Sequence, residues 1–240
     1  MAINYNIRPY LIINGKRSDS ILGLLITALA PVSKPQILTQ VETVNGRDGD
    51  IVTPLGYGAY DKTISIALTY EYNIDDIIEF FNSEGKVVFS NEPDKYYKFA
   101  IYQRIDFERL IRFRTADVTF HVQPFKYSDE ESVKTFTDRE FKIVNQGNIY
   151  SRPTISITGF GTITLFINTK QILKIELGNL PRTIIIDGSE MNAYSEDGAF
   201  LNRIVTGDYD KMILSSGNNK IEITGGDISR VSIDHYSRWI

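Results

Sequence analysis

The sequence predicts a mainly β protein in two domains, an α+β domain followed by a β-sandwich. Many short segments alternate apolar and polar side chains, and the clearest is residues 118–123, where Val118, Phe120 and Val122 share one face. Only one segment has the spacing of an amphipathic helix. In the second half, turn signals recur about every 8–12 residues, as in all-β sandwiches. Strands with one buried face therefore dominate the predicted fold.

Length and the change of composition after Tyr127 predict the domain boundary. The chain has 240 residues, enough for two domains of about 100–150 residues each. Pro124 is expected to end the strand over residues 118–123, or to place it at a sheet edge, because proline lacks a backbone donor. The acidic run Asp129-Glu130-Glu131 then reads as a solvated linker. The predicted domains are residues 1–130 and 131–240.

The predicted helix of the first domain runs from Asn73 to about residue 82. Ile74, Ile77, Ile78 and Phe81 form one apolar stripe at the spacing i, i+3, i+4, i+7. Asn73 is a favourable N-cap, and the two aspartates that follow in the first turn complement the helix dipole. A single helix among strands is expected to pack on a sheet.

The remaining segments of the first domain are predicted as strands. Asn14-Gly15 is a hairpin turn signal, and Asn45 to Asp50 form a second turn with two glycines. Residues 21–30 resemble a signal-peptide core, but Asp19 and Pro31 flank it, so a buried strand without a signal peptide is expected. Predicted strands cover residues 9–14, 21–30, 36–44, 64–68, 86–90, 96–104, 104–110 and 112–122.

The second domain reads as strands separated by glycine- and asparagine-rich turns. Its predicted strands cover residues 141–144, 154–158, 162–168, 172–177, 183–187, 212–214, 220–224 and 231–234. No helical period appears in these residues, which favours a β-sandwich.

Composition and motifs argue against catalysis. Neither His121 nor His235 lies in a nucleophile motif, no phosphate-binding or zinc-protease spacing is present, and no cofactor or metal is expected. The absence of cysteine excludes disulfides and thiol chemistry. A net charge of -4 argues against a surface for sequence-specific nucleic-acid binding. The sole tryptophan, Trp239, is expected to pack against the sandwich.

A series of short motifs resembles the distal tail protein (Dit) family of siphophages that infect Gram-positive bacteria. In the first domain the motifs are Leu11-Ile12-Ile13-Asn14-Gly15, Gly46-Arg47-Asp48-Gly49, Gly58-Ala59-Tyr60 and Pro124-Phe125-Lys126-Tyr127. In the second they are Asn145-Gln146-Gly147-Asn148, Arg152-Pro153-Thr154-Ile155, Ile184-Ile185-Ile186-Asp187-Gly188, Met191-Asn192-Ala193-Tyr194, Asn202, Gly207-Asp208-Tyr209, Gly217-Asn218-Asn219-Lys220-Ile221 and Arg238-Trp239-Ile240. Each motif is short, and their order over the chain is what is specific. One departure is Asp210 after Tyr209, where the family often has proline.

The resemblance implies an N-terminal belt domain that forms a homohexameric ring and a galectin-like C-terminal β-sandwich. It implies a virion protein at the tail tip, made in the host cytoplasm, that joins the tail tube protein to baseplate proteins or a tail-associated fibre or lysin. DNA would pass through the lumen of the ring, and no membrane partner is implied. On this reading Asn45, Gly46, Arg47, Asp48 and Gly49 are candidate subunit contacts.

Two other functions remain open from the residues alone. A β-sandwich could be a carbohydrate-binding module that recognises host cell-wall polysaccharide, with Trp239 as a contact. A cell-wall hydrolase would have to use His121 or His235. Because the two domains account for the whole length, no inserted carbohydrate-binding module is expected, and the chain itself is not expected to bind the host receptor.

Overall fold

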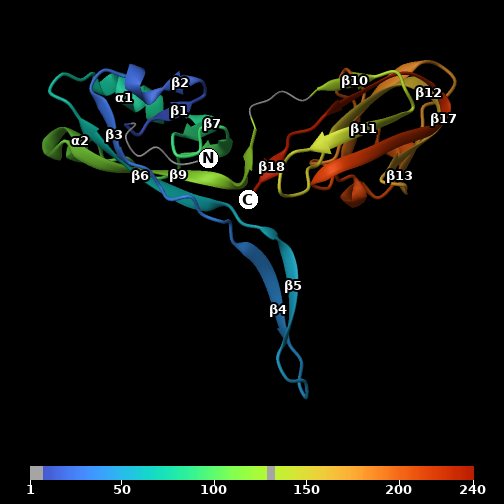
Figure 1. Cartoon of the computed structure of the whole chain (residues 1–240), viewed down its shortest axis with the longest axis horizontal. Coiled ribbons are helices and arrows are strands. Elements are labelled where there is room, and N and C mark those ends of the chain that lie inside the picture. The colour runs from blue at the N-terminus through green and yellow to red at the C-terminus, as the bar shows by residue number, and fades with distance from the viewer. Residues whose placement is uncertain (1–7, 129–132) are drawn as a thin grey trace. The chain divides into compact units, whose positions relative to one another are not determined.

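The computed structural model describes residues 8–128 and 133–240, and the chain divides into two compact units between residues 129 and 130 (Figure 1). Strands hold 54% of the residues and helices 10%, so the prediction of a mainly β protein is confirmed. The predicted boundary after residue 130 and the acidic run lie outside the described residues.

One antiparallel sheet organises the first unit, with the strand order β2-β1-β7-β8-β9-β6-β3. The hairpin predicted at Asn14-Gly15 is confirmed: both residues have positive φ, 48° and 86°, and join β1 to β2. The strands of this sheet order are β1 (Leu11–Ile13), β2 (Lys16–Arg17), β3 (Leu24–Ala28), β6 (Tyr60–Leu68), β7 (Glu84–Phe89), β8 (Tyr96–Ala100) and β9 (Thr115–Tyr127), and the 3-10 turn η1 (Ser18–Ser20) follows β2.

The predicted helix is confirmed as α1 (Ile74–Phe81). Its N-cap is the expected Asn73, whose side-chain oxygen accepts a hydrogen bond from the Asp75 amide at 3.1 Å. The buried stripe is Ile77, Phe80 and Phe81, whereas Ile78 is exposed. The predicted stripe was therefore wrong at Ile78, because the face that meets the sheet is rotated towards Phe80.

The prediction of a strand over residues 104–110 is wrong, because a second helix, α2 (Phe107–Phe113), lies there. The Asp106 carboxylate accepts a hydrogen bond from the Arg109 amide at 2.9 Å and so caps the first turn. Leu110 is fully buried, and Arg114 ends the helix in the left-handed conformation at φ 61°. The Asp106 cap and the burial of Leu110 therefore favour a helix over the strand expected at residues 104–110.

The strand through residues 118–123 has its expected buried face but not its expected end. Val118, Phe120 and Val122 are fully buried, which confirms the alternation. However, β9 continues through Pro124 to Tyr127. The pairing of β9 with β8 shifts register between Tyr97 and Phe99, in the part of the ladder opposite Pro124. A missing backbone donor is tolerated at such an irregularity.

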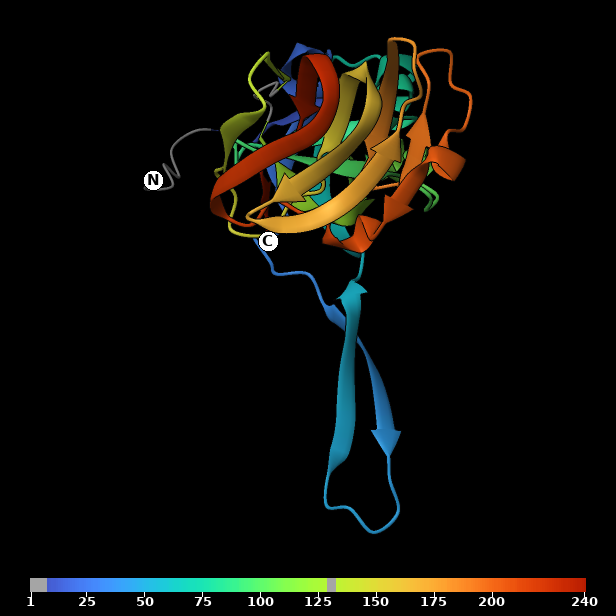
Figure 2. The same ribbon diagram turned by 90° about the vertical axis from the view of Figure 1, so that its right-hand side faces the viewer.

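A second, two-stranded sheet belongs to the first unit and consists of β4 (Ile37–Thr43) and β5 (Asp50–Tyr57). We call residues 37–57 the arm. Figures 1 and 2 show the arm projecting as a long hairpin from the body of this unit. The two strands of the arm thus pair with each other and with no other described strand.

The second unit is built entirely of strands and short 3-10 turns in the residues that the structure describes. These are β10 (Lys134–Phe136), β11 (Glu140–Asn145), β12 (Thr154–Ile167), β13 (Lys170–Glu176), β14 (Arg182–Asp187), β15 (Asn192–Tyr194), η2 (Asn202–Ile204), β16 (Val205–Gly207), η3 (Tyr209–Lys211), β17 (Gly217–Asp234) and β18 (Arg238–Trp239). The strand predicted at 212–214 is wrong: the residues follow η3, and Leu214 makes only an isolated bridge to Ser151.

Two long bent strands, β12 and β17, replace the four shorter strands that the sequence predicts. Residues 154–159 of β12 lie between β14 and the end of β17, whereas residues 163–167 lie between β13 and the beginning of β17. The register shifts between these two parts, and Gly225 and Gly226 have φ of 73° and 51°. The bent strands let one continuous sheet fold over a shared apolar core.

The bend in β17 can be tested with two glycines that differ only in their surroundings. Gly217 and Gly225 both have positive φ, but a Cβ would meet nothing at Gly217 and would lie 2.5 Å from the Thr162 oxygen at Gly225. We expect G217A to lower the free energy of unfolding of this unit by about 1 kcal/mol. G225A should cost at least about 2 kcal/mol more, since backbone atoms must move. Urea unfolding followed by the backbone NMR signals of β12 and β17 measures both, and equal losses would contradict this account of the bend.

Candidate functional site

The arm is the most distinctive surface of the first unit because its apolar side chains face water. Val41 and Val52 lie opposite one another on the two strands and are 56% and 58% exposed. Leu38, Val44 and Leu55 are exposed as well. An isolated two-stranded hairpin is at best marginally stable in water, and contiguous exposed apolar surface marks a site of protein contact. The arm therefore has the character of an interaction element.

The five candidate contact residues, Asn45 to Gly49, lie together at the tip of the arm, and all are exposed. Gly46 and Gly49 have φ of 82° and 76°, and the Arg47 amide donates to the Val44 oxygen at 3.1 Å. Within the described residues, the side chains of Arg47 and Asp48 make no ion pair. The turn leaves both charged groups free for a partner, while their role as subunit contacts stays a prediction.

A buried lysine contacts the chain just before the arm, a place that we call the root of the arm, and no sequence pattern predicted this role. Lys62 of β6 is 1% exposed, and its ammonium donates to the oxygen of Pro31 at 2.8 Å. The same Nζ lies 5.1 Å from the ring centroid of Tyr97 and 5.3 Å from that of Phe89, within the range of cation–π contact. Pro31 lies just before the arm, so this bond fixes where the chain leaves the body.

Glu92 supplies the negative charge of the same buried cluster. Its carboxylate binds the Lys126 ammonium at 2.8 Å and accepts a hydrogen bond from the Tyr97 hydroxyl at 2.6 Å. Burial lowers the pKa of Lys62, against the opposing effect of Glu92. Burial and the bond to Glu92 raise the pKa of Tyr97. Glu92 is paired with Lys126, whereas the charge of Lys62 is compensated by the Pro31 carbonyl and the aromatic rings.

A second hydrogen bond strengthens this root. The Asn91 side chain donates to the Ala30 oxygen at 3.1 Å, one residue before the carbonyl that Lys62 holds. On the returning strand, the Gly58 amide donates to the Gln36 oxygen at 2.9 Å. The outgoing segment is therefore bound to the body before the arm begins, and the Gly58 bond ties the returning segment to the outgoing one.

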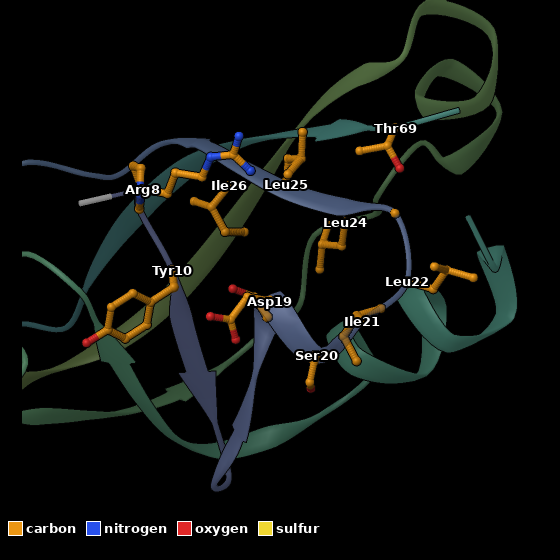
Figure 3. Close-up of a pocket in the computed structure, with 13 residues that line it drawn as sticks. Arg8, Tyr10, Asp19, Ser20, Ile21, Leu22, Leu24, Leu25, Ile26 and Thr69 are labelled. Atoms are coloured by element: carbon orange, nitrogen blue, oxygen red, sulfur yellow. The ribbon is translucent and has the colours of Figure 1, made fainter. Parts of the chain in front are cut away.

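A cavity of about 440 Å³ lies beside β3 and is lined by residues 8–10, 18–26 and Thr69 (Figure 3). Ile21, Leu24 and Ile26 give it apolar walls, and Asp19 is its acidic group. The Arg17 guanidinium binds the Asp19 carboxylate at 2.6 Å, which lowers the pKa of that carboxyl. This charge is thus already paired, and the described residues that line the cavity include no histidine.

In the part of the chain that the structure describes, neither histidine hydrogen-bonds to a serine or threonine hydroxyl. The His121 ring nitrogen Nδ1 is 2.8 Å from the Asp61 carboxylate on a partly exposed face of β9. His235 is buried in the second unit, with Nε2 3.2 Å from the Val144 oxygen. Burial lowers the pKa of His235, so its neutral form is favoured.

The remaining candidate features are a metal cluster, a membrane-spanning helix and the sugar contact Trp239. Within residues 8–128 and 133–240 there is no group of three His, Asp or Glu side chains that could hold a metal ion. In the same ranges no helix is long and apolar enough to cross a membrane. Trp239, the candidate sugar contact, is half-buried in β18.

The arrangement of the chain can be compared with solved structures. No protein-family model matches the sequence, and neither does any curated protein. The crystal structure of SPP1 Dit (gp 19.1), described as a paradigm of the hub adsorption apparatus in Gram-positive infecting phages, matches with a TM-score of 0.67. The match covers 97% of this chain and 99% of that chain at 14% identity. This chain has the fold of SPP1 Dit.

A second match is a chain of the phage P2 baseplate in its activated conformation with Ca. It has a TM-score of 0.51 and 11% identity, and it covers 96% of this chain and 98% of that chain. The resemblance to distal tail proteins drawn from the sequence motifs is therefore confirmed for the fold of the whole chain.

The root of the arm can be tested by replacing Lys62 with methionine, whose unbranched, uncharged side chain is one atom shorter. K62M removes the charged donor from the Pro31 oxygen, a bond worth roughly 1.5–3 kcal/mol. We expect the Gly58 amide, which closes the arm's root, to exchange its hydrogen about tenfold faster or more. The exposed Lys98 serves as the control, and K98M should leave this exchange unchanged. Equal protection of Gly58 in both variants would show that Lys62 does not hold the arm.

The buried His235 makes the stability of the second unit depend on pH. The unfolded chain takes up a proton at an imidazole pKa near 6.5, whereas the folded unit resists it because the pKa is lowered. The free energy of unfolding should therefore fall as the pH drops below about 6.5, by at most about 1.4 kcal/mol per pH unit. H235Q should reduce this dependence, as measured by urea unfolding followed by the backbone NMR signals of β12 and β17. H121Q, in the other unit, should not, and an unchanged slope in H235Q would refute the assignment.

Proposed function

We propose that this chain is a structural protein of a phage tail tip, a hub ring that links the tail tube to the baseplate or tail-tip fibre. The observation that carries the proposal is the match to SPP1 Dit over nearly the full length of both chains. A shared fold does not by itself transfer a function. The exposed arm supplies the independent support, since it gives the first unit a surface suited to assembly.

The proposed ring contains six copies joined through the first unit. Rings form when two different surfaces of one subunit are complementary and the rotation between neighbours closes. The arm offers one such surface, because Val41 and Val52 are more than half exposed and, within the described residues, Arg47 and Asp48 make no ion pair. Covering them against a neighbouring copy would remove apolar area from water and stabilise the arm.

The lumen, the docking partners and the location of the protein follow from the same proposal. DNA would pass through the ring, and a net charge of -4 suits a wall that must not retain it. The tail tube protein and a baseplate protein, or a tail-associated fibre or lysin, would bind the two faces of the ring in the virion. We assign no catalytic activity to the chain, and the second unit would serve as a docking domain.

Solution mass tests the ring directly. Light scattering across concentrations should give six times the chain's 27.3 kDa, or twice that value for a stacked pair of rings. A variant in which a short Gly–Ser turn replaces residues 38–56 should stay folded and become monomeric, because it lacks the arm. A full-length protein that stays monomeric at all concentrations would contradict self-assembly. Binding of that monomer to host cell-wall polysaccharide, lost on mutation of Trp239, would favour the carbohydrate-binding alternative.

A further inference from the structure

The exposed face of α2 combines positive charge with apolar surface. Arg109, Arg112 and Phe113 follow the spacing i, i+3, i+4 and so lie together on the helix. Leu110 faces the core, whereas Phe113 is 64% exposed. Within the described residues, neither Arg109 nor Arg112 makes an ion pair. We call these three residues the α2 face.

One face of the arm combines apolar surface with negative charge. Val41 and Val52 are cross-strand partners, and the next pair on the same face is Thr43 with Asp50. The Thr43 hydroxyl donates to the Asp50 carboxylate at 2.8 Å, which leaves the second carboxylate oxygen available. Over the whole arm, Glu42, Asp48 and Asp50 oppose the single base Arg47. The arm and the α2 face are thus complementary in both charge and apolar character.

The two surfaces lie at opposite ends of one rigid ladder. β6 and β9 pair from Tyr60 with Val122 at the end where the arm joins, to Ala67 with Thr115 at the end where α2 joins. Figure 1 shows α2 and the arm at the two ends of these strands. A head-to-tail ring needs two different complementary surfaces on separate parts of the subunit, and this arrangement provides them.

We propose that the arm of one copy docks on the α2 face of the next copy. Phe113 covers Val41 and Val52, while Arg109 and Arg112 bind the carboxylates of Asp48 and Asp50. The apolar contacts supply burial, and the charge-assisted hydrogen bonds fix the register of the arm. This inference rests on the proposed ring and names the surface that receives the arm.

Two charge-reversed variants test the docking. D48K/D50K has a basic arm and a basic α2 face, whereas R109E/R112E has an acidic arm and an acidic α2 face. Each variant alone places like charges in every arm–α2 contact. In an equimolar mixture that alternates around an even-numbered ring, every contact joins opposite charges again. The matched control is K142E/K170E, which reverses two exposed lysines of the second unit and has the same net charge as R109E/R112E.

The measurement is sedimentation velocity of each protein alone and of the mixture, with circular dichroism to confirm the fold. The dissociation constant of each variant alone should be at least about tenfold larger than that of wild type. The mixture should assemble like wild type. The control should assemble like wild type. Added salt should weaken the wild-type contact, because it screens the exposed charges.

The outcomes separate this inference from the ring itself. If wild type and both variants form the ring equally well, the arm does not dock on the α2 face, whereas the proposal of a ring is retained. If both variants are weakened but the mixture gives no recovery, the two surfaces do not meet and the inference is wrong. If wild type and the mixture are both monomeric, self-assembly and the docking are both refuted.

Discussion

The fixed root of the arm is the constraint on which the proposed assembly depends. A lysine ammonium in a protein core is costly unless hydrogen bonds and nearby charge compensate for lost water. Lys62 meets this requirement with the Pro31 oxygen, the surrounding aromatic rings and the negative charge of Glu92. An apolar side chain would fill the same space with less cost. An apolar side chain could not bind the carbonyl that precedes the arm. The buried charge therefore positions the arm and does not add to the stability of the core.

A positioned arm changes the energetics of association. A flexible hairpin would lose conformational freedom on docking, and that entropy would oppose binding. Here the Lys62 bond on the outgoing chain and the Gly58 amide on the returning chain already order the root. The remaining length is a two-stranded ladder whose apolar side chains join no hydrophobic core in the described part of the first unit. Preorganisation at the root and incompleteness along the arm together favour assembly over independent folding.

The sequence predicted the parts of the fold that depend on short-range pattern. The alternation around Phe120 and the cap at Asn73 both appear as expected, because burial and capping act locally. It failed where two local signals compete, as at α2, where the Asp106 cap outweighs an alternating reading of residues 104–110. It also could not reveal the buried role of Lys62, since a lysine in a strand ordinarily faces solvent. The turn at the tip of the arm was recognisable from its glycines. The exposure of Val41 and Val52 was not, because apolar and polar residues alternate in the same way in a strand that faces a core and in one that faces a partner.

The same reasoning explains why the fold is shared with SPP1 Dit at only 14% identity. A core strand needs apolar residues of suitable size at every second position, and many sequences satisfy that. An interface between copies has a narrower requirement, because one surface must match the other in shape and charge, and a change on one side must be met on its partner. In this chain the carboxylates of the arm and the arginines of α2 are such a pair, separated by the length of the β6–β9 ladder. The fold therefore identifies the architecture, while the matching of these two surfaces decides whether the architecture closes into a ring.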